Sequence, residues 1–171
     1  MKAYDVKVRL DDFRPLTWRD LIIPANITFR DLDIILKILW DFAGGHLSQF
    51  SFPNEDIFIS PNNYHDPFNE SIDGSCQIID EFFDIFKKCY WEYDFGDGWS
   101  FTIEIKKTVD LDKDYPVIKR YKGEYNPQDD IGGVWGLEKL IKNSPDELTT
   151  FDKDFVQMDL EDYKDNYLYE F

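Results

Sequence analysis

The chain has 171 residues, a net charge of −16 at pH 7 and an aromatic content of 18%. This length suits one domain with a sizeable core, and the aromatic content excludes a disordered chain. The negative charge argues against direct nucleic-acid binding, because lysine and arginine contacts to phosphates supply most of that affinity. The longest apolar stretch, residues 34–40, is far shorter than the roughly 20 residues of a membrane span, so no membrane association is expected.

The first half of the chain predicts two strands, a helix and two further strands. Residues 4–10 alternate between apolar and charged side chains, which is typical of a half-buried strand. Thr28 followed by Asp31 predicts a capping box at a helix start. Gly44-Gly45 predicts the end of that helix, because glycine tolerates the left-handed conformation there. We also expect strands over residues 16–23, 48–52 and 56–59.

The second half predicts a loop, a hairpin and several helices. Residues 60–74 carry the proline, asparagine and glycine of an exposed loop. From residue 99 the alternation predicts a strand that pairs with residues 88–94 as an antiparallel hairpin. Short helices are expected over residues 78–86, over residues 134–142 and from Pro145. We expect the core to contain Trp18, Leu36, Leu39, Trp99, Phe101 and Ile103.

Five segments together resemble the plasmid pRiA4b ORF-3-like family. They are RPLTWR (14–19), HLSQF (46–50), YDFGDGW (93–99), PQDDIGGVWG (127–136) and, more weakly, FDKDF (151–155). The resemblance implies a single α+β domain over residues 1–162, in which a largely antiparallel sheet packs against a helix that follows the first hairpin and against C-terminal helices. Residues 163–171 would form an acidic, aromatic tail. The family has no established activity, and some members are labelled resolvases or insertion-element passenger proteins, which implies an association with mobile genetic elements.

Two aspartate–glycine turns carry the candidate site. Asp94 and Asp97 flank Gly96, with Gly98 following, and Asp129-Asp130 precedes the glycines before the helix at residues 134–142. The structural interpretation is that short carboxylates bind turn amides while Gly96 and Gly98 supply positive φ, and that Asp129 and Asp130 cap the helix. The functional interpretation is a hard-cation site or an acid–base pair. We expect the two turns to lie side by side as the rim of a cleft that also contains Trp99 and Trp135.

Other residues carry weaker signals. Arg14, Trp18 and Arg19 could form an anion or aromatic binding patch, although strand pairing and cation–π packing explain them nearly as well. His46 follows a helix, which favours a structural role. The basic cluster at residues 119–122 is interpreted as solvated surface. Neither a cofactor nor a defined set of metal ligands is expected.

The leading hypothesis is a non-catalytic binding or interaction domain with a protein or small-molecule partner. The alternative is a metal-dependent hydrolase that uses Asp94, Asp97, Asp129 and Asp130. A third hypothesis is an acidic decoy for the basic surface of a nucleic-acid-binding protein. The two cysteines, Cys76 and Cys89, lack the spacing of a disulfide framework or a CxxC motif, which predicts reduced thiols in the cytoplasm.

Overall fold

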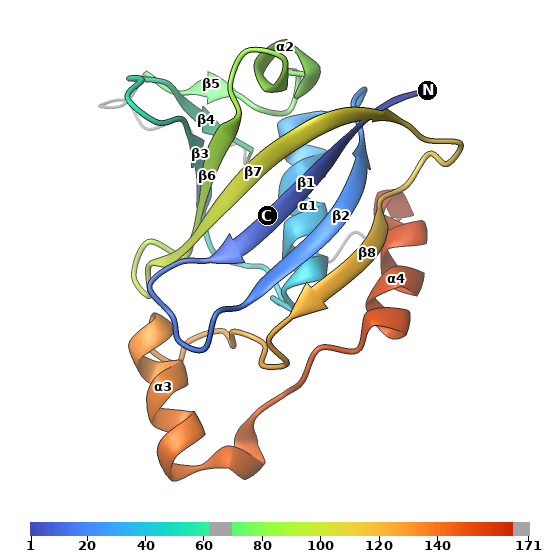
Figure 1. Cartoon of the computed structure of the whole chain (residues 1–171). Helices are drawn as coiled ribbons and strands as arrows, with labels where there is room; N and C mark the ends of the chain where they lie inside the picture. The colour runs from blue at the N-terminus through green and yellow to red at the C-terminus, as the bar shows by residue number, and fades with distance from the viewer. Residues whose placement is uncertain (62–69, 166–171) are drawn as a thin grey trace.

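One curved, mostly antiparallel sheet organises the protein (Figure 1). The structure is a computed structural model that describes residues 1–61 and 70–165. The strand order is β5-β4-β3-β6-β7-β1-β2-β8, and among the described strands only β4 and β5 pair in parallel. The strands are β1 (Lys2–Leu10), β2 (Trp18–Pro24), β3 (Ser48–Ser51), β4 (Phe58–Ser60), β5 (Ile72–Asp73), β6 (Lys88–Tyr93), β7 (Trp99–Asp110) and β8 (Val117–Lys122).

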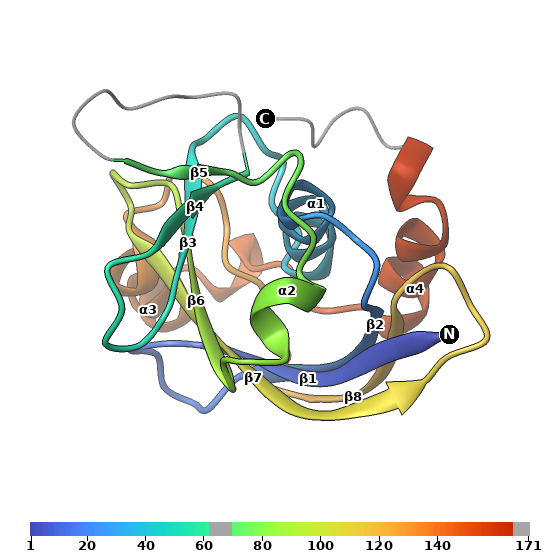
Figure 2. The same cartoon turned by 90° about the horizontal axis from the view of Figure 1, so that it is seen from above.

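The helices are α1 (Phe29–Leu39), α2 (Asp80–Phe83), α3 (Gly133–Asn143) and α4 (Lys153–Glu161), with single 3₁₀ turns at Pro145–Glu147 and Tyr163–Asp165. Viewed from above, α1 lies within the concave side of the sheet, with α4 beside it (Figure 2). This arrangement confirms the single α+β domain. Within the described residues, no helix combines the length and the apolar character that crossing a bilayer requires.

The helix α1 begins where the sequence predicts and is buried on nearly all sides. The Thr28 hydroxyl accepts from the Asp31 amide, and the Asp31 carboxylate accepts from the Thr28 amide, which completes the capping box. Leu36 and Leu39 are both 0% exposed. The helix ends at Leu39 with Trp40 as its C-cap, five residues before the predicted glycine stop.

The β6–β7 hairpin confirms the predicted pairing and positions the candidate site. Tyr93 pairs with Trp99 at the closed end of the hairpin. Trp99, Phe101 and Ile103 point inward and are each 0% exposed. The turn that joins the two strands therefore lies at one end of the sheet, close to the start of α3 (Figure 1).

The strand β2 corrects one core expectation. Trp18 is only half-buried and lies on the outer face of the sheet, with Lys7 Nζ 4.3 Å from its ring centre. Because side chains alternate along a strand, the next residue, Arg19, points inward and is 0% exposed. Its guanidinium carbon lies 4.6 Å from the Trp40 ring centre and 4.0 Å from that of Phe151.

Three elements were not predicted, namely β5, β8 and α4. The basic cluster lies on β8, where Lys119 pairs with Asp5 and Arg120 with Asp20. The positive charges of Lys119 and Arg120 are therefore neutralised by aspartates on neighbouring strands. Tyr163, the first residue of the predicted tail, is only 1% exposed. Residues 166–171 of that tail lie outside the described residues.

Candidate functional site

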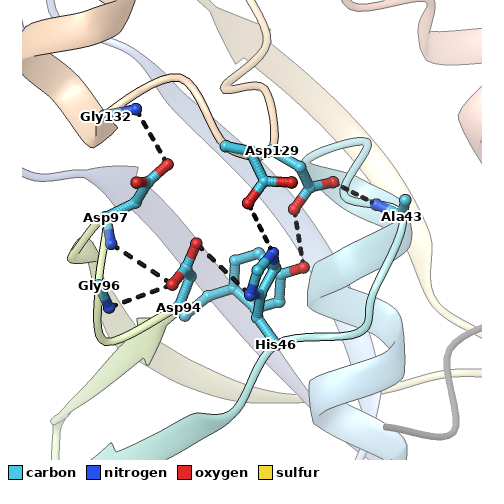
Figure 3. Close-up of polar contacts among 9 residues, drawn as sticks. Ala43, His46, Asp94, Gly96, Asp97, Asp129 and Gly132 are labelled. Atoms are coloured by element: carbon cyan, nitrogen blue, oxygen red, sulfur yellow. Dashed lines mark hydrogen bonds and ion pairs between the residues drawn. The ribbon is translucent and has the colours of Figure 1, made fainter.

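Three segments that are distant in sequence meet at one end of the sheet: the β6–β7 turn, the chain after α1 and the chain before α3 (Figure 3). The Gly132 amide donates a hydrogen bond to Asp97 Oδ2 at 3.1 Å. Gly133 lies against the Asp97 carbonyl, and a Cβ on Gly133 would be 2.3 Å from that oxygen. The two aspartate–glycine turns are thus in direct contact. We call His46, Asp94, Asp97, Asp129 and Asp130 together the acidic rim.

Asp94 closes the β6–β7 turn. Its Oδ1 accepts hydrogen bonds from the amides of Gly96 at 3.1 Å and Asp97 at 3.4 Å. Positive φ was expected at Gly96 and Gly98, but the structure has it at Asp94 (+59°) and Gly98 (+71°). Aspartate tolerates this left-handed conformation better than most residues. The structural interpretation therefore holds for Oδ1, while Oδ2 faces His46.

Asp129 fastens the segment before α3 to the rest of the domain. Its Oδ1 accepts from the Tyr93 hydroxyl at 2.8 Å, and its Oδ2 accepts from the Ala43 amide at 2.8 Å. Burial, followed by the hydrogen bond to Asp129, raises the pKa of Tyr93, so this hydroxyl remains a donor at neutral pH. Both oxygens of Asp129 thus serve to position the chain.

His46 lies between two carboxylates. Its Nε2 is 3.0 Å from Asp130 Oδ1, and its Nδ1 is 3.7 Å from Asp94 Oδ2. His46, Asp94 and Asp130 each offer one possible ligand atom, and these three atoms lie within 4.8 Å of one another. Among the described residues, this is the only group of three or more such side chains that could hold a metal ion. Sequence reasoning gave His46 a structural role, because its neighbours along the chain contain neither of its two carboxylate partners.

Negative charge extends beyond the rim itself. Asp41 lies just past the end of α1. Partial burial raises the pKa of Asp41, and the carboxylates of Asp129 and Asp159 contribute further to this rise. A field of this sign attracts cations and opposes anions.

The two tryptophans of the predicted cleft have different surroundings. Trp99 is 0% exposed, because the first residue of β7 points into the core, so it cannot contact a ligand at the rim. Trp135, in the first turn of α3, is 68% exposed, and Phe95 on the β6–β7 turn is 48% exposed. Lys139 Nζ lies 4.3 Å from the Trp135 ring centre, a cation–π contact.

The predicted patch of Arg14, Trp18 and Arg19 is not one surface. Arg19 lies in the core, where its guanidinium donates to the carbonyls of Lys122 and Gly123, and burial lowers its pKa to about 9. Arg14 lines an open groove of about 670 Å³. A ligand at the surface therefore cannot contact Arg14 and Arg19 together.

A curved antiparallel sheet around one central helix, with an acidic rim at one end, defines a single-domain α+β protein. The chain belongs to the family of the plasmid pRiA4b ORF-3-like protein, whose model matches residues 2–169. It is 26% identical over 140 residues to the uncharacterized protein y4hQ of Sinorhizobium fredii (strain NBRC 101917 / NGR234). The matched region covers 80% of this chain and 70% of y4hQ.

A solved structure shares the fold. The crystal structure of the protein of unknown function MM3350 from Methanosarcina mazei Go1 superposes with a TM-score of 0.71 at 26% identity. The match covers 82% of this chain and 80% of MM3350. Both relatives are themselves uncharacterised, so their names assign no activity.

Proposed function

We propose that the protein is a non-catalytic binding domain whose binding surface is the acidic rim. The observation that carries this proposal is the direct contact between the two aspartate–glycine turns, through the hydrogen bond from Gly132 to Asp97. This contact places carboxylates from two distant segments on one side of the molecule, where backbone hydrogen bonds hold them. Rigid positioning of this kind lowers the entropy cost of binding a partner.

The use of the rim carboxylates favours binding over hydrolysis. The proposed hydrolase would need four free aspartates around one ion or water. Asp97 accepts from the Gly132 amide, and both oxygens of Asp129 are occupied by Tyr93 and Ala43. Two of the four carboxylates thus already stabilise the chain, which argues against a site in which all four aspartates are free.

The chemistry of the rim favours a cationic partner. Four aspartates converge there, and the chain as a whole carries a net charge of −16. The exposed Trp135 adds an aromatic surface, and its contact with Lys139 shows that an ammonium group fits over this ring. A protein segment that presents lysine or arginine beside apolar residues matches both properties.

The thiols support a cytoplasmic location for this function. Cys76 and Cys89 are both free, and Cys76 is exposed. An exposed free thiol suits a reducing compartment.

Fluorescence anisotropy with labelled lysine- and arginine-containing peptides, in buffer with a chelator, tests the proposed binding. We expect Trp135→Ala to lower the affinity for the peptide that binds most tightly. The control is Phe155→Ala on α4, where Phe155 is similarly exposed (62%), and it should leave that affinity unchanged. Binding should also weaken as salt rises, because exposed charges are screened. Equal effects of the two variants, or no binding by any peptide, would refute the proposal.

A further inference from the structure

We infer that His46, Asp94 and Asp130 form a binding site for a divalent transition-metal ion. This inference deepens the proposed function, because it names an inorganic cation for the same acidic rim. The ligand set differs from the four aspartates considered from sequence: it adds a histidine and omits Asp97 and Asp129. The three donor atoms come from three separate segments and lie within 4.8 Å of one another.

The second carboxylate oxygen of Asp94 is open to a ligand. The Asp94 side chain is only 10% exposed. Its Oδ1 is occupied by two turn amides, whereas Oδ2 accepts no hydrogen bond from the described residues. His46 Nδ1 lies 3.7 Å from Oδ2, which exceeds hydrogen-bond length. The lone pairs of Oδ2 are therefore available to a ligand, and a cation between Oδ2 and the imidazole would use them.

The donor types identify the class of ion. Calcium and magnesium prefer sites made of oxygen ligands alone, whereas imidazole together with carboxylates suits zinc, manganese, iron, cobalt or nickel. Metal–ligand bonds of about 2.0–2.2 Å place neighbouring ligands of one ion roughly 3–4 Å apart. Asp130 Oδ1 lies 3.0 Å from His46 Nε2 and Asp94 Oδ2 lies 3.7 Å from His46 Nδ1, so each carboxylate is within this range of one imidazole nitrogen.

The two carboxylates face opposite nitrogens of the imidazole, so an ion bound through one nitrogen requires one carboxylate to turn. Asp130 is the residue free to do so, because its side chain is 73% exposed. Asp94 is fixed by the turn. Three protein ligands leave further coordination positions for water or for a donor group of a partner.

Asp129 and Asp97 hold the ligands in place from outside the site. Asp129 is fixed by Tyr93 and Ala43 and directly precedes Asp130 in the chain. Asp97 fixes Gly132, two residues after Asp130. The rival interpretation is that a protonated His46 simply forms an ion pair with Asp130, in which case no ion binds.

Equilibrium dialysis of the untagged full chain against Zn²⁺ or Mn²⁺, with metal counted by mass spectrometry, tests the site. We expect one ion per chain, and a loss of affinity of at least about tenfold in His46→Ala and in Asp130→Asn. Asp112→Asn is the control: it removes one exposed negative charge just past the end of β7 that lies opposite the rim, and it should bind metal like the parent. If His46→Ala does not fold, Asp130→Asn still tests the site, because the exposed side chain of Asp130 can be changed without disturbing the core.

Three results would overturn the inference: no ion bound at micromolar concentrations, equal losses in Asp112→Asn and Asp130→Asn, or binding of Ca²⁺ in preference to Zn²⁺ and Mn²⁺. The peptide experiment runs with a chelator present, so it separates the two proposals. Peptide binding that depends on Trp135 without any metal binding refutes only the metal site. Metal binding without peptide binding refutes only the proposed partner.

Discussion

Replacing Gly133 by alanine tests how strongly the two aspartate–glycine turns are joined. Gly133 has a φ of +69°, and an alanine Cβ would lie 2.3 Å from the Asp97 carbonyl oxygen. The left-handed backbone alone costs alanine about 1–2 kcal/mol. Forcing the two main chains apart adds about 1–3 kcal/mol, the usual cost of overpacking. We therefore expect Gly133→Ala to lower the free energy of unfolding by about 2–5 kcal/mol.

The neighbouring turn offers a matched control. Gly98 has a φ of +71°, but no atom outside its immediate neighbours lies within 4 Å of a Cβ built there. Gly98→Ala should therefore show only the backbone cost of about 1–2 kcal/mol. Urea unfolding followed by circular dichroism gives both values. If Gly133→Ala is no less stable than Gly98→Ala, the contact between the turns is loose, and the argument for a rigid acidic rim fails.

Three further changes test other parts of the structure. Trp99→Ala should cost about 3–5 kcal/mol in chemical unfolding, because the ring is fully buried; a cost below about 1 kcal/mol would contradict its inward orientation. Asp33→Ala should cost a similar 3–5 kcal/mol or so, because it leaves the buried ammonium of Lys37, 2.7 Å away, without this carboxylate; an unchanged unfolding midpoint would contradict this. Burial alone would raise the pKa of Asp5, but its hydrogen bond to Lys119 and the neighbouring lysine charges outweigh burial and lower it. A lowered folded-state pKa stabilises the protein above the unfolded value of about 3.9, and this contribution is lost as pH falls through the folded value. Asp5→Asn should therefore be less stable than the parent at pH 7, and the gap should close below about pH 4; a gap that is constant with pH would refute the assignment.

Local patterns were predictable from the sequence because their causes lie within a few residues. The capping box of Thr28 and Asp31 depends only on the first turn of α1. The inward face of β7 follows from strict alternation after Trp99. The family resemblance supplied the single α+β domain.

The remaining features depend on residues far apart in the chain. An arginine in a strand normally predicts an exposed side chain, yet Arg19 is buried against aromatic rings from segments near residues 40, 121 and 151. For the candidate site, sequence identified Asp94 and Asp130. It could not identify His46 as their partner, because only the folded sheet brings the end of α1 to the β6–β7 turn.

The position of β1 has a consequence for how the chain is made. This strand lies inside the sheet between β2 and β7, and its register joins Lys2 to Asp110. Pairing between such distant residues is slow, because a long loop must close before any contact forms. Until β7 and β8 are synthesised, both edges of the hairpin of β1 and β2 are unpaired, and open edges promote aggregation. A fragment ending at residue 98 should therefore self-associate more than one ending at residue 110, as sedimentation velocity would measure. The nascent chain is accordingly most exposed to misassembly midway through translation, well before the acidic rim is complete.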